Sequence, residues 1–329
     1  MTNSNKILLT GAGFTHDFGT PLSSDMWCAI FNCPGIQQTK EIRQELLRNI
    51  NFESVYHKIL NGNYSETAKQ EIIVAVEAAY RDKVEAILNK YDSKIDQDFD
   101  FDKFSEFVRA FSFVFTLNQD LFMERFFLSD LESGKPKILG MNHFLRIKPD
   151  ERTQLEIVAS GVNKYPRKIS KYLLLRPQNI KADEKSQMLH GSNSHYVKLH
   201  GSQNWFDPDF RIESECGQMY KMILGENKID KINNEPLLKF YFQIFTETLN
   251  NIKNLWIIGY SFHDKHINDE ISKAITNGLK IHIINPMSAK DFHAELKSKP
   301  NGIAICDGLA AYYPYTLRQF FKKGTRILD

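Results

Sequence analysis

Cysteine is scarce in this 329-residue sequence, and its four cysteines are scattered. A zinc ribbon needs two close cysteine pairs, whereas no C-x-x-C pair occurs here and only Cys28 and Cys33 lie near each other. We expect no disulfide framework in so long a chain, whose first residues lead straight into a predicted strand without a signal peptide. We therefore expect reduced, mostly buried thiols and no bound metal.

Long apolar runs and a strong charge imbalance are also missing. No run approaches the roughly 20 apolar residues that are needed to cross a bilayer. The formal net charge of +2 gives no argument for binding to a membrane or directly to nucleic acid. We therefore expect a cytoplasmic protein that has neither of these as a partner.

Short apolar, β-branched runs predict the strands of a sheet. Near-continuous apolar character is typical of parallel strands covered on both faces, and the runs are Lys6–Thr10, Phe113–Leu117, Tyr196–Leu199, Leu255–Ile258, Leu279–Ile284 and Gly302–Ile305. Between them, apolar residues recur at three- and four-residue steps over Gln70–Tyr91 and Pro236–Lys253, which predicts helices. The alternation predicts an α/β fold, a Rossmann-like doubly wound parallel sheet.

Two stretches do not fit this alternation. The segment at about 40–105 is long and mostly helical in pattern, and it separates the first two predicted strands. The segment at about 129–195 is polar and rich in lysine and arginine. We interpret both as insertions that form a cap beside the sheet, within a single domain spanning residues 1–329.

The first predicted strand ends at a glycine turn, Gly11-Ala12-Gly13-Phe14-Thr15. Glycines at such a turn let the backbone approach a pyrophosphate at the start of the following helix. The pattern is not a full G-x-G-x-x-G, because His16 stands three residues after Gly13. Considered alone, the turn is explained almost as well by a tight structural bend.

The second and third predicted strands also end in polar residues. Asn118 and Asp120 follow the second strand, and His200 follows the third. Ligands of an open α/β sheet bind outside the carboxyl ends of its strands. There an amide can orient a hydroxyl or a water, and an imidazole can act as a general base near neutral pH. The alternative interpretations are an Asn/Asp turn that closes the strand and a structural histidine.

Two later strands complete the set. Gly259 and Ser261 follow one of them, and Asn285 follows the next. Gly259 and Ser261 would meet a phosphate or ribose by backbone approach and hydroxyl donation, and Asn285 would hold the adenosine ribose. Five polar strand ends in chain order are harder to explain as independent turns than any one of them. We therefore predict that they converge on one dinucleotide.

Taken in order, the segments G-A-G-F-T, T-L-N-Q-D, K-L-H-G, G-Y-S and I-N-P resemble the sirtuin motifs G-A-G-x-S, T-x-N-x-D, H-G, G-T-S and I-N. The resemblance runs from Lys6 to about Gly308, apart from the two insertions. Phe14 and Phe18-Gly19-Thr20-Pro21 resemble the loop that closes over the nicotinamide half of NAD. The resemblance implies a catalytic pair, Asn118 and His200, and NAD contacts from Gly11, Ala12, Gly13, Phe14, Thr15, Asp120, Gly259, Ser261 and Asn285.

One departure separates the chain from the sirtuin deacylases. They carry a four-cysteine zinc module between the H-G and G-T-S motifs, where this chain has only Cys216. In this respect the chain resembles the bacterial sirtuin-like domains of anti-phage defence systems, which hydrolyse NAD once infection is sensed. The resemblance implies an NAD+ glycohydrolase without zinc that releases nicotinamide and ADP-ribose, linear or cyclic. Asn118 would orient the attacking water or ribose hydroxyl, and His200 would accept its proton.

Three other functions would use some of the same features. An NAD-dependent protein deacylase is the nearest alternative, because it would use the same NAD site. A non-catalytic NAD or ADP-ribose sensor would keep the glycine turn without needing both Asn118 and His200. A dehydrogenase would need an acidic residue about 20 residues after the glycine turn, where Asn32–Gln38 is instead predicted as a turn.

The resemblance also bears on regulation. The chain stops at Asp329, soon after the last predicted strand. We therefore expect control by a homo-oligomer or by a separate regulatory protein, such as a DNA-translocase-type ATPase. The aromatic C-terminal segment is predicted to pack against the sheet, with an interface as the alternative; it contains Tyr312, Tyr313, Tyr315, Leu317, Phe320 and Phe321.

Overall fold

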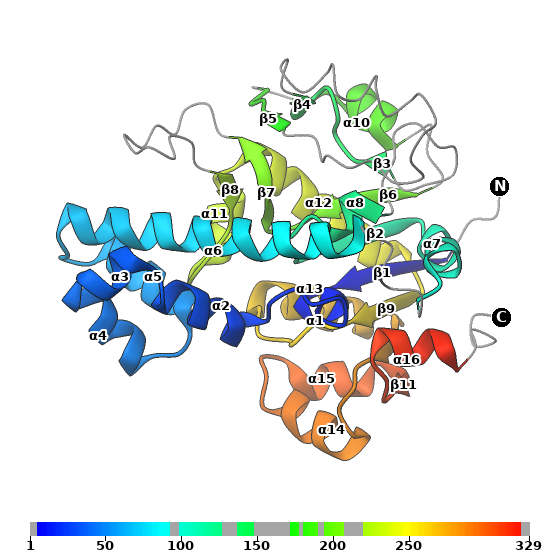
Figure 1. Cartoon of the computed structure of the whole chain (residues 1–329). Coiled ribbons are helices and arrows are strands. Elements are labelled where there is room, and N and C mark those ends of the chain that lie inside the picture. The colour runs from blue at the N-terminus through cyan, green and yellow to red at the C-terminus, as the bar shows by residue number, and fades with distance from the viewer. Residues whose placement is uncertain are drawn as a thin grey trace.

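The structure is a computed structural model, and it describes residues 5–92, 99–126, 137–147, 172–177, 180–189, 194–206 and 220–323. Its centre is a seven-stranded parallel sheet with the strand order β11-β10-β9-β1-β2-β6-β3 (Figure 1). The strands are β1 (Lys6–Thr10), β2 (Phe113–Thr116), β3 (Lys137–Ile138), β6 (His195–Lys198), β9 (Asn254–Ile258), β10 (Lys280–Ile284) and β11 (Leu309–Tyr313). The predicted α/β class with a Rossmann-like parallel sheet is confirmed.

The strand order reverses direction at β1. The chain passes from β1 to β2 and β6 on one side, and it returns to the other side of β1 through β9 and β10. Five of the six predicted strands match the observed strands to within one residue at each end. In open α/β sheets, such a switch point leaves a crevice at the carboxyl ends of the strands.

Helices cover both faces of this sheet. Neighbouring residues in a strand face opposite sides, and Val114 is aligned through β1 with Trp256. The Trp256 ring lies 6.2 Å from that of Phe107 in α7 (Phe101–Arg109). On the other face, the Phe115 ring lies 5.0 Å from that of Phe245 in α12 (Pro236–Asn251). Burial on both faces explains why the strands are apolar throughout instead of alternating.

Residues 23–92 form a group of helices beside the sheet, which we call the helical lobe (Figure 1). It contains α2 (Ser23–Phe31), α3 (Pro34–Gln38), α4 (Lys40–Arg48), α5 (Phe52–Asn61) and the long α6 (Glu66–Asp92). These helices enclose a hydrophobic cluster of their own, which includes Ile30, Leu46, Ile59 and Ile72. The predicted helix Gln70–Tyr91 lies within α6, and the described residues of the segment 40–105 are mostly helical, as the sequence predicts.

A smaller mixed sheet has the strand order β4-β5-β7-β8. Its strands are β4 (Leu145–Ile147), β5 (Tyr172–Leu174), β7 (Gly201–Phe206) and β8 (Tyr220–Met222). The described residues do not include 127–136, 148–171, 178–179 and 190–193, so most of the predicted insertion at 129–195 lies outside them. Cys216 also lies outside them.

The predicted strand Gly302–Ile305 is wrong. These residues begin the helix α15 (Gly302–Asp307), and the edge strand β11 follows directly after it. A four-residue apolar run has no period that separates a buried helix from a strand. The true strand lies at an edge of the sheet, where its side chains are half-buried or exposed. Its run Leu-Ala-Ala-Tyr-Tyr contains no β-branched residue that would mark it as a strand.

Two smaller predictions are also wrong. The segment Asn32–Gln38, predicted as a turn, contains α3, whose first position is Pro34, a site where the missing N–H costs no helix hydrogen bond. The described cysteines are free, but Cys28 is exposed and Cys33 and Cys306 are only half-buried, so they are not the mostly buried thiols expected.

The aromatic C-terminal segment packs against the sheet, as predicted. Leu317, Phe320 and Phe321 of α16 (Leu317–Lys322) are buried. The Phe320 ring lies 6.5 Å from that of Trp256, on the sheet face that α7 also covers. Among the described residues, no helix combines the length and the apolar character that crossing a membrane requires.

Candidate active site

A cleft of about 620 Å³ opens at the carboxyl edge of the parallel sheet. Its volume lies within the range of small-molecule pockets, about 300–1,000 Å³. The ends of five strands line it through Gly11, Gly13, Leu117, Asn118, Asp120, His200, Gly259, Ser261 and Asn285. The helical lobe also lines it, through Met26, Phe52, Glu53 and Tyr80. The structure therefore brings the polar strand ends singled out in the sequence to one cleft.

The glycine turn is built by backbone-to-backbone packing against the end of β9. The amide of Gly11 donates to the carbonyl of Ile258 at 3.0 Å, and that of Gly13 donates to the carbonyl of Gly259 at 2.9 Å. A Cβ atom on Gly11 would lie 2.7 Å from the Gly259 oxygen, and one on Gly13 would lie 2.9 Å from the Gly259 Cα. The glycines are therefore required by the fold itself, in addition to any closeness to a ligand.

Thr15, Asn118 and Asp120 form a connected network that we call the amide wall. The Asn118 Nδ2 donates to the Thr15 Oγ1 at 3.3 Å, and the Thr15 Oγ1 donates to the Asp120 Oδ2 at 3.0 Å. The Asn118 main-chain amide donates to the Thr116 Oγ1 at 3.0 Å, which fixes the backbone at the end of β2. No described residue donates a hydrogen bond to the Asn118 Oδ1, so this oxygen remains available as an acceptor at the cleft.

A buried ion pair anchors the amide wall from behind. The Lys198 Nζ donates to the Glu124 Oε1 at 2.8 Å and also to the main-chain oxygen of Asp120. The other oxygen of Glu124 accepts from the Tyr196 hydroxyl at 3.2 Å. Burial raises the pKa of Asp120, and the positive charge of Lys198 opposes that rise. The charges of this network are therefore enclosed, and each has a fixed partner.

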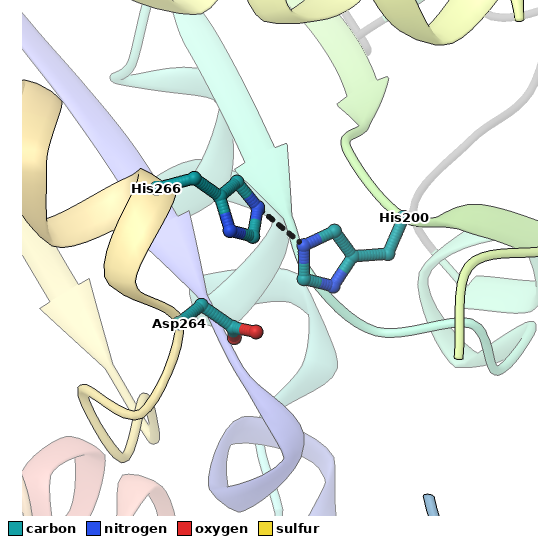
Figure 2. A group of neighbouring side chains, drawn as sticks. All are labelled: His200, Asp264 and His266. Carbon is teal, nitrogen blue, oxygen red and sulfur yellow. Dashed lines mark hydrogen bonds between the residues drawn. The ribbon is translucent and has the colours of Figure 1, made fainter. Parts of the chain in front are cut away.

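A second group of polar side chains consists of His200, Lys228, Asp264 and His266, and we call it the histidine wall. Figure 2 shows the rings of His200 and His266 facing each other, with the Asp264 carboxylate beside them. The two Nε2 atoms are hydrogen-bonded at 3.1 Å. The nearest ligand-type atoms of His200, Asp264 and His266 all lie within 4.8 Å of one another.

The backbone holds these side chains in place. The carbonyl of His200 accepts from the Ile223 amide at 2.8 Å and from the Gln119 Nε2 at 3.4 Å. Asp264 is the N-cap of α13 (Lys265–Thr276), and His266 stands in its first turn. An N-cap aspartate ordinarily accepts from the amides of that turn, but Asp264 makes no such bond and pairs with Lys228 at 2.9 Å.

Burial and local charge set the protonation of the histidine wall. Burial lowers the pKa of His200 to about 3, although the charge of Asp264 opposes the shift. Burial also lowers the pKa of His266. For Asp264, burial acts to raise the pKa, but the positive charges beside it outweigh burial and bring the pKa to about 2. Because the imidazoles are neutral near neutral pH, Lys228 supplies the charge that keeps Asp264 ionised.

The remaining predicted contacts divide into two groups. Ala12, Ser261 and Asn285 line the cleft, and the Asn285 Oδ1 accepts from the Met287 amide at 2.9 Å, which orders the turn after β10. Phe14 and Thr15 do not line it. Phe14 is fully buried with its ring 5.5 Å from that of Phe104, and Thr15 lies behind Asn118. Of the residues predicted to contact NAD, most therefore line the cleft, whereas Phe14 and Thr15 lie behind its lining residues.

Sequence reasoning misses three members of the histidine wall. Asp264 and His266 stand in the segment S-F-H-D-K-H, directly after β9, so their position at a strand end is a signal that could have identified them. Lys228 is the first residue of α11 (Lys228–Asn233) and belongs to no motif. Its second partner, Glu53 of α5, lies 3.0 Å away and comes from the helical lobe, so only the tertiary structure reveals this contact.

Comparison with known proteins places the chain in a family. Solved structures to which the chain is similar include Sir2Tm bound to a propionylated peptide (13% identity, covering 97% of this chain and 90% of that one, TM-score 0.37). A Sir2 structure with a p53 peptide and NAD+ gives 13% identity, the same coverage and a TM-score of 0.35. No curated protein matches the sequence. A model of the SIR2-like domain matches residues 112–299, more than half of the chain, so the chain belongs to the SIR2-like domain family.

Proposed function

We propose that the protein is an NAD+ glycohydrolase whose reaction takes place in the cleft between the amide wall and the histidine wall. The proposal rests mainly on one observation. Asn118 at the end of β2, His200 at the end of β6 and the glycine turn all line the same cleft. The cleft is large enough for a dinucleotide held partly at the surface, and polar groups from five strand ends line it. NAD is the substrate, and no zinc is needed for the reaction proposed.

The proposed reaction breaks the bond between C1′ of the ribose and the nicotinamide nitrogen. Nicotinamide leaves with the bonding electron pair, and the oxygen of a water or of a ribose hydroxyl forms the new bond to C1′. Asn118 orients the attacking oxygen through its Oδ1, because its Nδ2 is already engaged by Thr15. His200, neutral at working pH, accepts the proton that this oxygen loses, directly or through a ribose hydroxyl.

The hydrogen bond between the two histidines restricts which nitrogen of His200 does this. One Nε2 must carry the proton that joins them, and the other must accept it. If His200 donates from Nε2, its Nδ1 holds the lone pair that takes the substrate proton. His266 therefore acts on the reaction as a positioning residue, by fixing the tautomer and the ring orientation of His200.

The direct test is nicotinamide release from NAD by the purified protein and by Asn118→Ala and His200→Ala variants. We expect each variant to lose about a hundredfold or more in turnover, as is typical for a lost acid–base or positioning group. Asn277→Ala and His293→Ala are matched controls, because both residues are exposed and neither lines the cleft. Undiminished release by both cleft variants would reject the assignment.

A parallel assay separates the alternatives. An acetyl-lysine peptide added with NAD tests deacylation, because a deacylase would release nicotinamide only in proportion to the peptide it consumes. Tight NAD binding by the wild-type chain without any nicotinamide release would indicate a sensor. The sequence supports NAD hydrolysis over deacylation. The deacylases carry a four-cysteine module in an interval where this chain has only Cys216.

We further propose a place for this reaction in the cell. The resemblance to bacterial anti-phage sirtuin-like domains supports a role in defence by depletion of NAD, in the cytoplasm. We propose that the chain is one domain in which the segments at about 40–105 and 129–195 form a cap. We also propose that its activity is regulated by formation of a homo-oligomer or by a separate regulatory ATPase. Light scattering of the purified protein tests self-assembly, and a strict monomer at high concentration would leave only a separate partner.

A further inference from the structure

We infer that His200, Asp264 and His266 form a site for one divalent transition-metal ion of the zinc type, and that an ion bound there blocks the cleft chemistry. Metal binding goes beyond the proposed function, since it does not depend on whether NAD is cleaved, whereas the inhibition rests on that function. In the part of the chain that the structure describes, the side chains of these three residues lie close enough together to bind one ion. They are drawn together in Figure 2.

The donor set suits zinc. Two imidazole nitrogens and one carboxylate oxygen are ligands that zinc prefers, at about 2.0–2.2 Å from the ion. Two ligand atoms of a tetrahedral ion at those bond lengths lie about 3.4 Å apart. The two Nε2 atoms are already 3.1 Å apart, close to that separation. The nearest donor atoms of the three residues all lie within 4.8 Å of one another, so the carboxylate needs to approach by at most about 1.4 Å.

Asp264 is turned away from its ordinary helical role. As the N-cap of α13 it makes no side-chain bond to the helix, although that bond is the usual one for an aspartate at this position. Its carboxylate instead pairs with Lys228 at 2.9 Å, and it lies beside the two histidine rings (Figure 2). Because the Asp264 carboxylate does not cap the helix, we infer that it has a role in the cleft.

Lys228 is the competitor of the metal ion. Its Nζ lies 2.9 Å from the Asp264 Oδ1 and 3.0 Å from the Glu53 Oε2, so it is shared between two carboxylates. A bound metal ion would take over Asp264 and leave Lys228 paired with Glu53. The exchange keeps every charge partnered, and it makes Lys228 the residue that sets how tightly the metal ion binds.

Metal binding and proton acceptance exclude each other at His200. The metal ion uses the Nε2 lone pair of His200 and replaces the hydrogen bond to His266, so the tautomer and orientation needed for the base are lost. The ion also places positive charge beside a substrate whose transition state gains positive charge on the ribose. Zinc bound here therefore inhibits nicotinamide release.

The first experiment measures metal binding with no NAD present, by calorimetry with Zn²⁺ and by the visible absorption of tetrahedral Co²⁺ in the purified full chain. We expect one ion per chain for the wild type, and at least tenfold weaker binding in His266→Gln and Asp264→Asn. His263→Gln is the matched control, since His263 is exposed, lines the same cleft and pairs with Lys299 instead. Lys228→Met removes the competitor and should tighten binding at least tenfold, an outcome that misfolding cannot produce.

Two results would overturn the metal site: no stoichiometric binding by the wild type, or equal affinity in the wild type, His266→Gln and Asp264→Asn. Either would leave the two histidines as a simple hydrogen-bonded pair. The inhibitory role is tested by nicotinamide release with Zn²⁺ and after its removal by a chelator. Slower release with Zn²⁺ in the wild type, with less slowing in Asp264→Asn, supports it. Unchanged or faster release by a zinc-loaded protein would overturn it, whatever the outcome for Asn118 and His200.

Discussion

The two walls of the cleft are built from different chemistry. In the amide wall, Asn118, Thr15 and Asp120 are joined by fixed hydrogen bonds, and the charges behind them are fully enclosed. In the histidine wall, the imidazoles are neutral and share one proton, and Asp264 is bound by a lysine that a second carboxylate also holds. One wall is therefore preorganised, whereas the other has partners that can exchange.

This difference suits the two walls to different tasks. A preorganised amide can hold an attacking oxygen in one orientation without reorganising during the reaction. A pair of neutral imidazoles can take up a proton and can also be modulated by charge or by an ion. We therefore expect the amide wall to position the attacking oxygen, and the histidine wall to provide proton transfer and regulation.

The largest expected effect breaks the support of the amide wall. Lys198→Met leaves Glu124 buried without its partner, which should lower the free energy of unfolding by about 3–5 kcal/mol. Lys273→Met is the matched control, because Lys273 forms a similar pair with Glu270 but is 67% exposed, and its loss should cost less than about 1 kcal/mol. Chemical denaturation of both variants measures the difference, and equal losses would contradict the account of the buried pair.

A smaller effect tests the contact between the glycine turn and β9. Gly259 has φ +65°, and a Cβ atom there would lie 2.0 Å from the amide nitrogen of Phe14. Gly259→Ala should therefore lower the free energy of unfolding by about 3 kcal/mol, from left-handed strain and overpacking together. Gly19→Ala is the control, since Gly19 has φ +93° with no atom within 4 Å of the added Cβ. Because Gly19→Ala adds only backbone strain, it should lower the free energy of unfolding by about 1–2 kcal/mol.

The smallest effect concerns the pH dependence of the histidine wall. An imidazole with the ordinary pKa of about 6.5 would lose about 30-fold of its neutral form between pH 8 and pH 5. Because burial lowers the pKa of His200 to about 3, His200 stays neutral over that range. The ratio kcat/KM for nicotinamide release should therefore change less than about twofold on account of His200. An acid limb with a midpoint near pH 6.5 would contradict the burial of this ring.

The lowered pKa of His200 also makes the stability of the fold depend on pH. In the unfolded chain His200 binds a proton as the pH falls through about 6.5, whereas in the folded chain it does so only near pH 3. Between these values the unfolded state holds more protons, so the free energy of unfolding decreases as the pH falls. Denaturation of the wild type and His200→Gln at pH 5 and pH 7.5 should show a smaller decrease in the variant.

The sequence predicts much of the fold because of how its strands are buried. Apolar runs that are followed by glycine, asparagine or histidine locate five strands to within a residue, and their polar ends locate Asn118 and His200 at the cleft. The edge strand β11 escapes prediction because its side chains are half-buried or exposed and its run of leucine, alanine and tyrosine contains no β-branched residue. Lys228 and Glu53 escape because their contact joins α11 to the helical lobe, and no local pattern in the sequence reports such a contact.

If the two walls act on one substrate, they must be coupled in catalysis, and a double-mutant cycle on nicotinamide release measures this coupling directly. Residues that act as a unit in one chemical step show strongly non-additive losses. We predict that Asn118→Ala combined with His200→Ala loses little more than the worse of the two single variants, about a hundredfold in kcat/KM. Independent losses that multiply to about 10,000-fold, or single variants that retain full activity, would contradict it.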